Sequence, residues 1–201
     1  MRLLRIRLSG PLPCARADSE CLYSPRVRPL RFSFLLAVFG GLMLACSPTL
    51  NWREVRPDGV CSMTLLLPCK PDRASKTVPL GGRPTRLSMT GCVAGGAVFA
   101  LAVAELADPD QTAQLLAQWQ SLTLAHMRAA QSRSEPVQVS GADARVPASH
   151  VWARGTHPDG QAIEGQARYF ARGSQMFQAV IYAPRIAPEA AETFFSSFKL
   201  P

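Results

Sequence analysis

Thiol groups offer the most distinctive covalent chemistry in this chain of 201 residues, which contains six cysteines. Cys46 directly follows an apolar run, and Cys61, Cys69 and Cys92 lie downstream of it. A thiol can be acylated or can pair in a disulfide, and the compartment decides whether a disulfide persists. The sequence contains no Cys-x-x-Cys pattern, so a redox-active pair is not indicated. The first question is therefore which cellular compartment the protein occupies.

The segment 32–45, FSFLLAVFGGLMLA, is typical of the apolar core of an export signal. Three arginines stand just before it, at Arg26, Arg28 and Arg31. A helix that spans a bilayer needs roughly 20 apolar residues, so this run is short for a permanent span. No uninterrupted apolar run of roughly 18 residues occurs anywhere, which excludes a polytopic membrane protein. We assign residues 26–45 to a signal peptide.

The apolar run ends in Met43-Leu44-Ala45-Cys46. With the run before them, these four residues resemble the lipobox of bacterial lipoproteins, although Met43 stands where that family usually has Leu. The resemblance implies that the Cys46 sulfur carries a diacylglycerol and that Cys46 becomes the new N-terminus. A further acyl chain, such as palmitate, completes a stable membrane anchor, because one chain alone binds only marginally. In that family an Asp after the cysteine usually marks retention in the inner membrane, so the resemblance makes Ser47 compatible with sorting to the outer membrane.

Two alternatives to lipidation stay open. Simple secretion would need small residues at the last and third-last positions of the signal, and Met43 fits the third-last position poorly. An uncleaved N-terminal anchor is the other alternative. Residues 1–25 fit no part of a signal, and we interpret them as a non-native or disordered extension from a start placed too far upstream.

Net charge changes once the first 45 residues are set aside. The whole chain has 22 Lys and Arg against 14 Asp and Glu, a formal charge of +8. Residues 1–45 hold seven arginines and two acids, so residues 46–201 keep 15 basic and 12 acidic residues, a net charge of +3. No basic run or basic–aromatic pattern remains in that part. A nucleic-acid partner is therefore not expected.

An exported protein sits where disulfides form, and three cysteines remain if Cys46 is acylated. Cys69 follows a strand-ending proline and Cys92 lies near the end of another expected strand, so we favour a Cys69–Cys92 disulfide. It would stabilise the fold by roughly 3 kcal/mol through loop closure. Cys61 paired with either of these cysteines, or no disulfide at all, are the alternatives. A buried free thiol is the expectation for Cys61.

Metal and catalytic sites find little support in the sequence. The histidines, His126, His150 and His157, lack the short spacing of a zinc site. The acids Glu105, Asp108 and Asp110 lack the central Gly and closing Glu of a calcium loop, and we interpret them as helix-capping residues. No nucleophile elbow or phosphate-binding loop occurs. We expect no metal, no cofactor and no catalytic residue.

Tryptophans and paired glycines also receive structural interpretations. The tryptophans, Trp52, Trp119 and Trp152, are expected to be core or rim residues rather than a ligand cage. The Gly pairs 81–82 and 95–96 are expected in hairpin turns, where Gly supplies positive φ.

The pattern of residues 46–201 predicts a tether at 46–56 and one domain at 57–201. Seven strands are expected, at 60–67, 77–80, 85–93, 98–106, 150–156, 161–171 and 176–182. A long helix is expected from Asp108 to about Arg128 or Gln131, with Leu115, Trp119 and Leu122 on its buried stripe. Residues 132–135 end it before Pro136. A short helix is expected at 189–198.

Short connections between successive strands favour antiparallel pairing, and helices then cover the sheet. We predict an α+β fold with a sheet of about six to seven strands, one long helix and one short C-terminal helix. The segments 60–68 and 169–200 resemble those of small envelope proteins that share the fold of PsbP and Mog1. That resemblance implies a central antiparallel sheet between helices, and it implies no activity, because members of the group do unrelated things.

Two functions from different classes are consistent with these observations. The first is a lipid-anchored periplasmic accessory or interaction protein that is attached to the membrane through Cys46. Its partner would be an envelope protein. The second is a small envelope ligand-binding protein or enzyme whose site only the fold assembles. A cleft with a histidine or acid of shifted pKa would favour the second, and a flat exposed apolar patch would favour the first.

Overall fold

The computed structural model describes residues 49–60, 63–157 and 159–200. All of them belong to one unit of the chain, Ser47–Pro201. Cys46, Cys61 and the proposed signal peptide lie outside the described residues.

An N-terminal meander of three antiparallel strands forms one half of the main sheet. These strands are β3 (Asp72–Leu80), β4 (Arg83–Ala94) and β5 (Ala97–Glu105). Gly81 and Gly82 join β3 to β4, and all four glycines of the two hairpin turns have positive φ. Turn geometry thus explains why these positions are glycine, because residues with a side chain adopt positive φ only at an energetic cost.

A second meander supplies the other half. It comprises β6 (Gln131–Val137), β7 (Ala148–Thr156), β8 (Ala162–Arg172) and β9 (Gln175–Ala183). The last strand, β9, pairs antiparallel with β5, with Leu101 opposite Ala179. The spatial order is therefore β3-β4-β5-β9-β8-β7-β6, and β3 and β6 are the two edges. The predicted antiparallel sheet, with one long and one short C-terminal helix, is confirmed.

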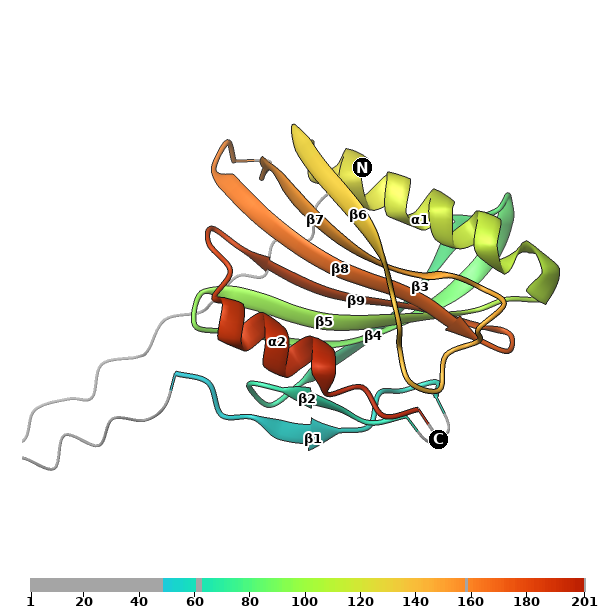
Figure 1. The fold of residues 1–201 in the computed structure, drawn as a ribbon, viewed down its shortest axis with the longest axis horizontal. Coiled ribbons are helices and arrows are strands. Elements are labelled where there is room, and N and C mark those ends of the chain that lie inside the picture. The colour runs from blue at the N-terminus through green and yellow to red at the C-terminus, as the bar shows by residue number, and fades with distance from the viewer. Residues whose placement is uncertain (1–48, 61–62, 158, 201) are drawn as a thin grey trace, which may run out of the picture. The chain divides into compact units, whose positions relative to one another are not determined.

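Each face of the sheet is covered by a different helix (Figure 1). Helix α1 (Thr112–His126) packs through Leu115, Leu116 and Trp119 on one face, in a cluster with Tyr169. Helix α2 (Pro188–Ser196) packs through Phe194 and its neighbours on the opposite face, in a second cluster. Alternation along each strand supplies both clusters, because successive side chains point to opposite faces. Within the described ranges, neither helix has the length and apolarity to cross a bilayer.

A two-stranded sheet adds to the α2 face. Strand β1 (Arg53–Val55) pairs with β2 (Leu65–Leu67), and Val55, Leu65 and Leu67 are buried in the α2 cluster. The sequence analysis places β1 within the tether, so packed structure begins before residue 57. It also places residues 60–67 in the main sheet, which is wrong for β2, because β2 pairs only with β1 among the named strands.

A disulfide joins Cys69, just after β2, to Cys92 in β4. It is the pair that the sequence analysis favours. The disulfide ties the small sheet to the first meander across 23 residues of sequence, and a loop of that size is stabilised by roughly 3 kcal/mol in the chain-entropy model.

The segment after α1 differs from the expectation. Helix α1 ends at His126, and Gln131–Val137 forms strand β6 where a helix end and a loop were predicted. Pro136 suggested a break in structure, but an edge strand tolerates proline, because half of its N–H groups face no partner strand. Leu122 is 52% exposed, so the buried stripe runs through Leu115 and Leu116 instead. Strand β3 is also longer than the four residues expected.

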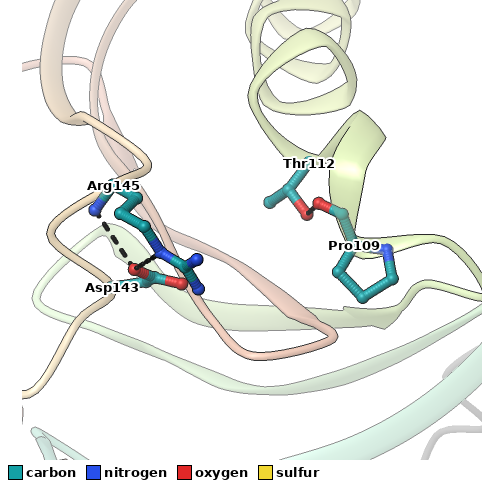
Figure 2. A network of polar contacts seen from close by, with 4 residues as sticks. All are labelled: Pro109, Thr112, Asp143 and Arg145. Atoms are coloured by element: carbon teal, nitrogen blue, oxygen red, sulfur yellow. Dashed lines mark hydrogen bonds and ion pairs between the residues drawn. The ribbon is translucent and has the colours of Figure 1, made fainter.

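Local side-chain bonds fix the start of α1. Asp108 caps a 3₁₀ turn, Pro109–Gln111, by accepting from the Asp110 N–H, so the predicted cap leads into α1 through this turn. The Thr112 hydroxyl donates to the Pro109 carbonyl at 2.6 Å (Figure 2). Figure 2 also shows the loop between β6 and β7, where Asp143 accepts from the backbone N–H of Arg145 and from its guanidinium.

The end of α1 has a Schellman geometry with an unusual residue type. The Ala129 N–H donates to the Leu124 carbonyl and the Arg128 N–H donates to the Ala125 carbonyl, both at 3.0 Å. Arg128 has a φ of 48°, in the region that favours glycine. Its side chain is exposed, so no side-chain packing offsets this backbone cost.

We expect Arg128→Gly to stabilise the protein by about 1 kcal/mol, because glycine relieves the left-handed conformation. Arg128→Ala is the matched control: it removes the same exposed side chain but keeps a Cβ. Chemical denaturation of the three proteins measures the difference. Equal stability of the Gly and Ala variants would contradict the assignment of strain to this backbone position.

Candidate functional site

A groove of about 450 Å³ lies on strands β6, β7 and β8 at the edge of the sheet. We call it the β6–β8 groove. Its side chains come from the same face of the sheet on which α2 packs. Ile186, just before α2, closes one side of the groove. The residues that line it are Gln131, Ser132, Arg133, Trp152, Ala153, Arg154, Glu164, Gly165, Gln166 and Ile186. Amide, guanidinium and carboxylate groups thus lie beside apolar surface in this lining.

A stack of aromatic rings supports this groove from below. The His150 and Trp152 rings lie parallel, with centroids 3.9 Å apart and planes inclined by 12°. The Phe195 ring of α2 tilts against His150 at 4.7 Å. On the other side, the Arg133 guanidinium lies 4.0 Å from the centroid of the Trp152 ring. We call these four residues the aromatic stack.

Strand register brings these residues together. His150 and Trp152 alternate along β7 and so share one face. Arg133 on β6 is directly opposite Trp152, and Gln166 on β8 is opposite it on the other side. Cross-strand neighbours of this kind lie about 5 Å apart at Cβ, close enough for the rings and guanidinium to touch.

His150 is held in its neutral form. Burial, together with the positive charges of Arg168 and Arg133, lowers the pKa of His150 to about 4. The Gln166 amide opposes the decrease, yet its position gives no hydrogen bond to His150 Nε2, which is buried without a partner. Arg168 Nε donates to His150 Nδ1 at 3.4 Å, so the proton of the neutral ring is on Nε2.

Arg168 links the stack to helix α2. Its Nη1 donates to the Phe195 carbonyl at 2.8 Å, and its guanidinium lies 5.1 Å from the Phe195 ring centroid. Partial burial lowers its pKa from the usual value, but arginine keeps its charge at neutral pH. Because no described carboxylate lies within ion-pair distance of Arg168, the positive charge beneath the groove is not cancelled locally.

Two ion pairs that involve lining arginines lie at the rim. Arg133 Nη1 lies 3.4 Å from Glu135 Oε1, and Arg154 Nη2 lies 3.3 Å from Glu164 Oε1. Glu164 Oε2 also accepts from the Ile186 N–H at 3.0 Å, which fixes the start of α2 against β8. The Arg133–Glu135 pair is exposed at both side chains and contributes only about 0–1 kcal/mol, so a ligand can displace Arg133 from its carboxylate. Glu164 is only 29% exposed, so its pair with Arg154 is partly buried.

The geometry of His150 is suited to structure and recognition rather than to proton transfer. A catalytic imidazole needs a pKa near the working pH and an accessible nitrogen. Here Nδ1 faces a cation, and Nε2 is buried. Among the described residues, no group of three His, Cys, Asp or Glu side chains has the geometry to hold a metal ion.

The other two histidines are not among the residues that line this groove. His126 is the last residue of α1 and is exposed. His157 follows β7, and its Nδ1 lies 3.0 Å from Asp159 Oδ1. Hydrogen bonding to the Gln161 N–H lowers the pKa of Asp159, and His157 adds to this. The structure brings none of the three histidines together.

The tryptophans divide between core and groove. Trp52 packs edge-on to Phe99 and Trp119 edge-on to Tyr169, as core residues do. Trp152 is half-buried and is the tryptophan that lines the groove, a position consistent with the expected core or rim role. Of the acidic residues, Asp108 caps the turn before α1, whereas Glu105 ends β5.

Sequence reasoning missed Arg133, Arg154 and Arg168. Arg154 lies within the expected strand 150–156, and its alternation with Trp152 offered a signal. Arg168 likewise alternates with Gln166 in the expected strand 161–171. No sequence pattern pointed to Arg133, because its strand is polar, exposed and interrupted by Pro136.

An exposed apolar row lies on another part of the sheet. Val93 is 70% exposed and is paired with Val98, and Met89 follows on the same face of β4. This row is small, and no described residue covers it. The molecule therefore carries both features that the sequence analysis names as discriminating, a histidine of shifted pKa beside a groove and an apolar patch.

No protein-family model matches this chain, and no curated protein matches it.

We expect the stability of the protein to fall as the pH decreases from about 6.5 toward 4. The unfolded chain binds a proton at His150 near pH 6.5, whereas the folded protein resists it until about pH 4. The stabilising contribution is complete above pH 6.5 and decreases on acidification by up to roughly 3 kcal/mol. Denaturant unfolding at several pH values measures it.

His150→Phe keeps a flat ring in the stack and removes the titrating group. In this variant the part of the pH dependence between 6.5 and 4 that belongs to His150 should disappear, whatever its absolute stability. His126→Phe is the control and should keep the slope. An unchanged slope in His150→Phe would contradict the assignment.

Proposed function

We propose that this chain is a lipid-anchored accessory protein of the bacterial envelope whose domain acts by binding a ligand in the β6–β8 groove. The anchor is the proposed thioether-linked lipid at Cys46, which rests on the lipobox resemblance. The binding site rests on the structure of the domain. Together they combine the accessory role with the ligand-binding alternative from the sequence analysis.

The observation that carries the binding role is the Arg133–Trp152–His150–Phe195 stack beneath an open groove. A fold normally pairs its buried polar groups, since an unpaired donor costs about 1–3 kcal/mol. Here His150 Nε2 stays unpaired next to a groove of polar side chains. Groups that cost stability and lie together in a cleft favour a binding function.

We also propose that the domain has the PsbP/Mog1-like fold. The arrangement of one antiparallel sheet between α1 and α2 supports this assignment, as does the helix that follows the last strand. The assignment concerns architecture alone and implies no activity. The proposed location is the periplasmic face of a membrane, with the outer membrane favoured by Ser47.

We expect the protein isolated from bacterial membranes to have the mass of residues 46–201 plus diacylglycerol and one further acyl chain. Cys46→Ser should remove this lipid and release the protein from the membrane fraction, because no other thiol follows the signal directly. Cys69→Ser is the control, since its loss leaves the anchor in place. A mass that retains residues before Cys46 would contradict lipidation and indicate an uncleaved anchor.

We expect a low-molecular-mass extract of the bacterial envelope to shift the indole N–H signal of Trp152 in nuclear magnetic resonance spectra. The lipidated protein in detergent micelles is the sample. The signals of Trp52 and Trp119 should not move, because both side chains pack in the core. An extract that shifts the core signals or none of the three would contradict the groove as the binding site.

A further inference from the structure

We propose that the β6–β8 groove binds a small carboxylate-bearing ligand, held between Arg133 on β6 and Arg154 on β7. This inference rests on the proposed function, because it names the ligand class for the same groove. A carboxylate of this kind can belong to a sugar acid or to an acidic amino acid. The planar, two-oxygen carboxylate is the shared chemistry.

Register places the two arginines within reach of one ligand group. Gln131 is opposite Arg154, and Arg133 is opposite Trp152. Arg133 and Arg154 are therefore diagonal neighbours on adjacent strands, about 7–8 Å apart at the backbone. Both side chains are long and mostly exposed, at 63% and 73%. Their guanidinium groups can converge on one oxyanion without any movement of the sheet.

Both arginines retain hydrogen-bond donors for a ligand. Arg133 meets Glu135 through Nη1 alone, and Arg154 meets Glu164 through Nη2 alone. A guanidinium group has five N–H donors, so most of them stay available. The Arg133–Glu135 contact is exposed and therefore weak.

The aromatic stack orients one of the two arginines before a ligand arrives. The Arg133 guanidinium rests on Trp152, which restricts its position and lowers the entropy that binding must remove. Trp152 is covered by His150 on one ring face and by Arg133 on the other. No free indole face remains for a neutral sugar to stack on, so recognition falls to the guanidinium groups.

Local charge favours a single negative charge on the ligand. Arg133, Arg154 and Arg168 contribute three positive charges, and Glu135 and Glu164 contribute two negative ones. His150 adds none at neutral pH. One carboxylate balances the excess, whereas a phosphate dianion would meet repulsion from Glu135 and Glu164.

The remaining lining suits the polar body of such a ligand. Gln131 and Gln166 each offer an amide that can both donate and accept. The groove volume of about 450 Å³ lies in the range of small-molecule sites.

The test is a titration of the lipidated protein in micelles, followed by the Trp152 indole signal. Glucuronate and the α-amide of N-acetyl-glutamate, each with a single carboxylate, are the probes for the two sources. Glucose and N-acetyl-glutaminamide are their neutral partners of matched shape, and inorganic phosphate is the competing anion. At least one of the two acids should shift Trp152 at a concentration at least tenfold below its neutral partner, and phosphate should bind more weakly than that acid.

Variants then assign the contacts. Arg154→Gln and Arg133→Gln should each weaken carboxylate binding about tenfold, because each removes a charge-assisted hydrogen bond. Arg145→Gln, an exposed arginine outside the groove, should leave the affinity unchanged. Arg133→Lys keeps the charge but loses the planar fork, so it should bind more weakly than the parent protein.

The other possible outcomes contradict either the carboxylate assignment alone or the binding function of the groove as well. Equal shifts by acids and their neutral partners, or tighter binding of phosphate, would overturn the carboxylate assignment and leave the groove as the binding site. If an envelope extract shifts the Trp152 signal but neither acid does, the carboxylate assignment is also overturned and the groove remains the binding site. If neither the extract nor the acids affect Trp152, the proposed function fails together with this inference.

Discussion

The pairing of β5 with β9 is the constraint on which the rest of the structure depends. These strands come from different meanders and join them into one sheet, with Leu101 opposite Ala179 and Phe99 opposite Ile181. Nearly every residue of β9 is buried, because helices cover both faces of the sheet centre. Such burial explains why its sequence, MFQAVIY, is apolar almost throughout rather than alternating. Since β9 also pairs with β8, the position of the β6–β8 groove follows from the same strand.

Polar groups inside this core are tolerated only where they find partners. On the α1 face, Gln178 of β9 donates to the Thr123 hydroxyl and to the Tyr169 hydroxyl, at 2.7 and 2.9 Å. The network ties α1 to two central strands and leaves Gln178 satisfied. Burial also raises the pKa of Tyr169, which keeps its hydroxyl protonated. His150, on the opposite face, differs because one of its nitrogens stays unpaired.

Local sequence patterns predicted most of this architecture, and their failures have physical causes. The strands β4, β5, β8 and β9 are bounded by glycine turns or prolines and carry strong apolar patterns, so sequence reasoning found them. The expected sheet size agrees with the seven observed strands, yet β2 leaves the sheet and β6 replaces it. An edge strand buries little, so β6 has no apolar periodicity to recognise. The candidate site was missed for the same reason, since Arg133 gains its role only through register with Trp152.

The choice of histidine at position 150 follows from what surrounds the ring. The position needs a flat side chain that fits between Trp152 and Phe195, and it needs an acceptor for the Arg168 guanidinium. Phenylalanine supplies only the ring, and a carboxylate supplies only the acceptor. Neutral imidazole supplies both, and it leaves Nε2–H unpaired at a cost of about 1–3 kcal/mol. Protonation would place a third cation between Arg133 and Arg168, which explains why the folded state holds the ring neutral. The stack thus keeps two arginines in place around an uncharged centre, and the positive charge that they bring stays available to the groove.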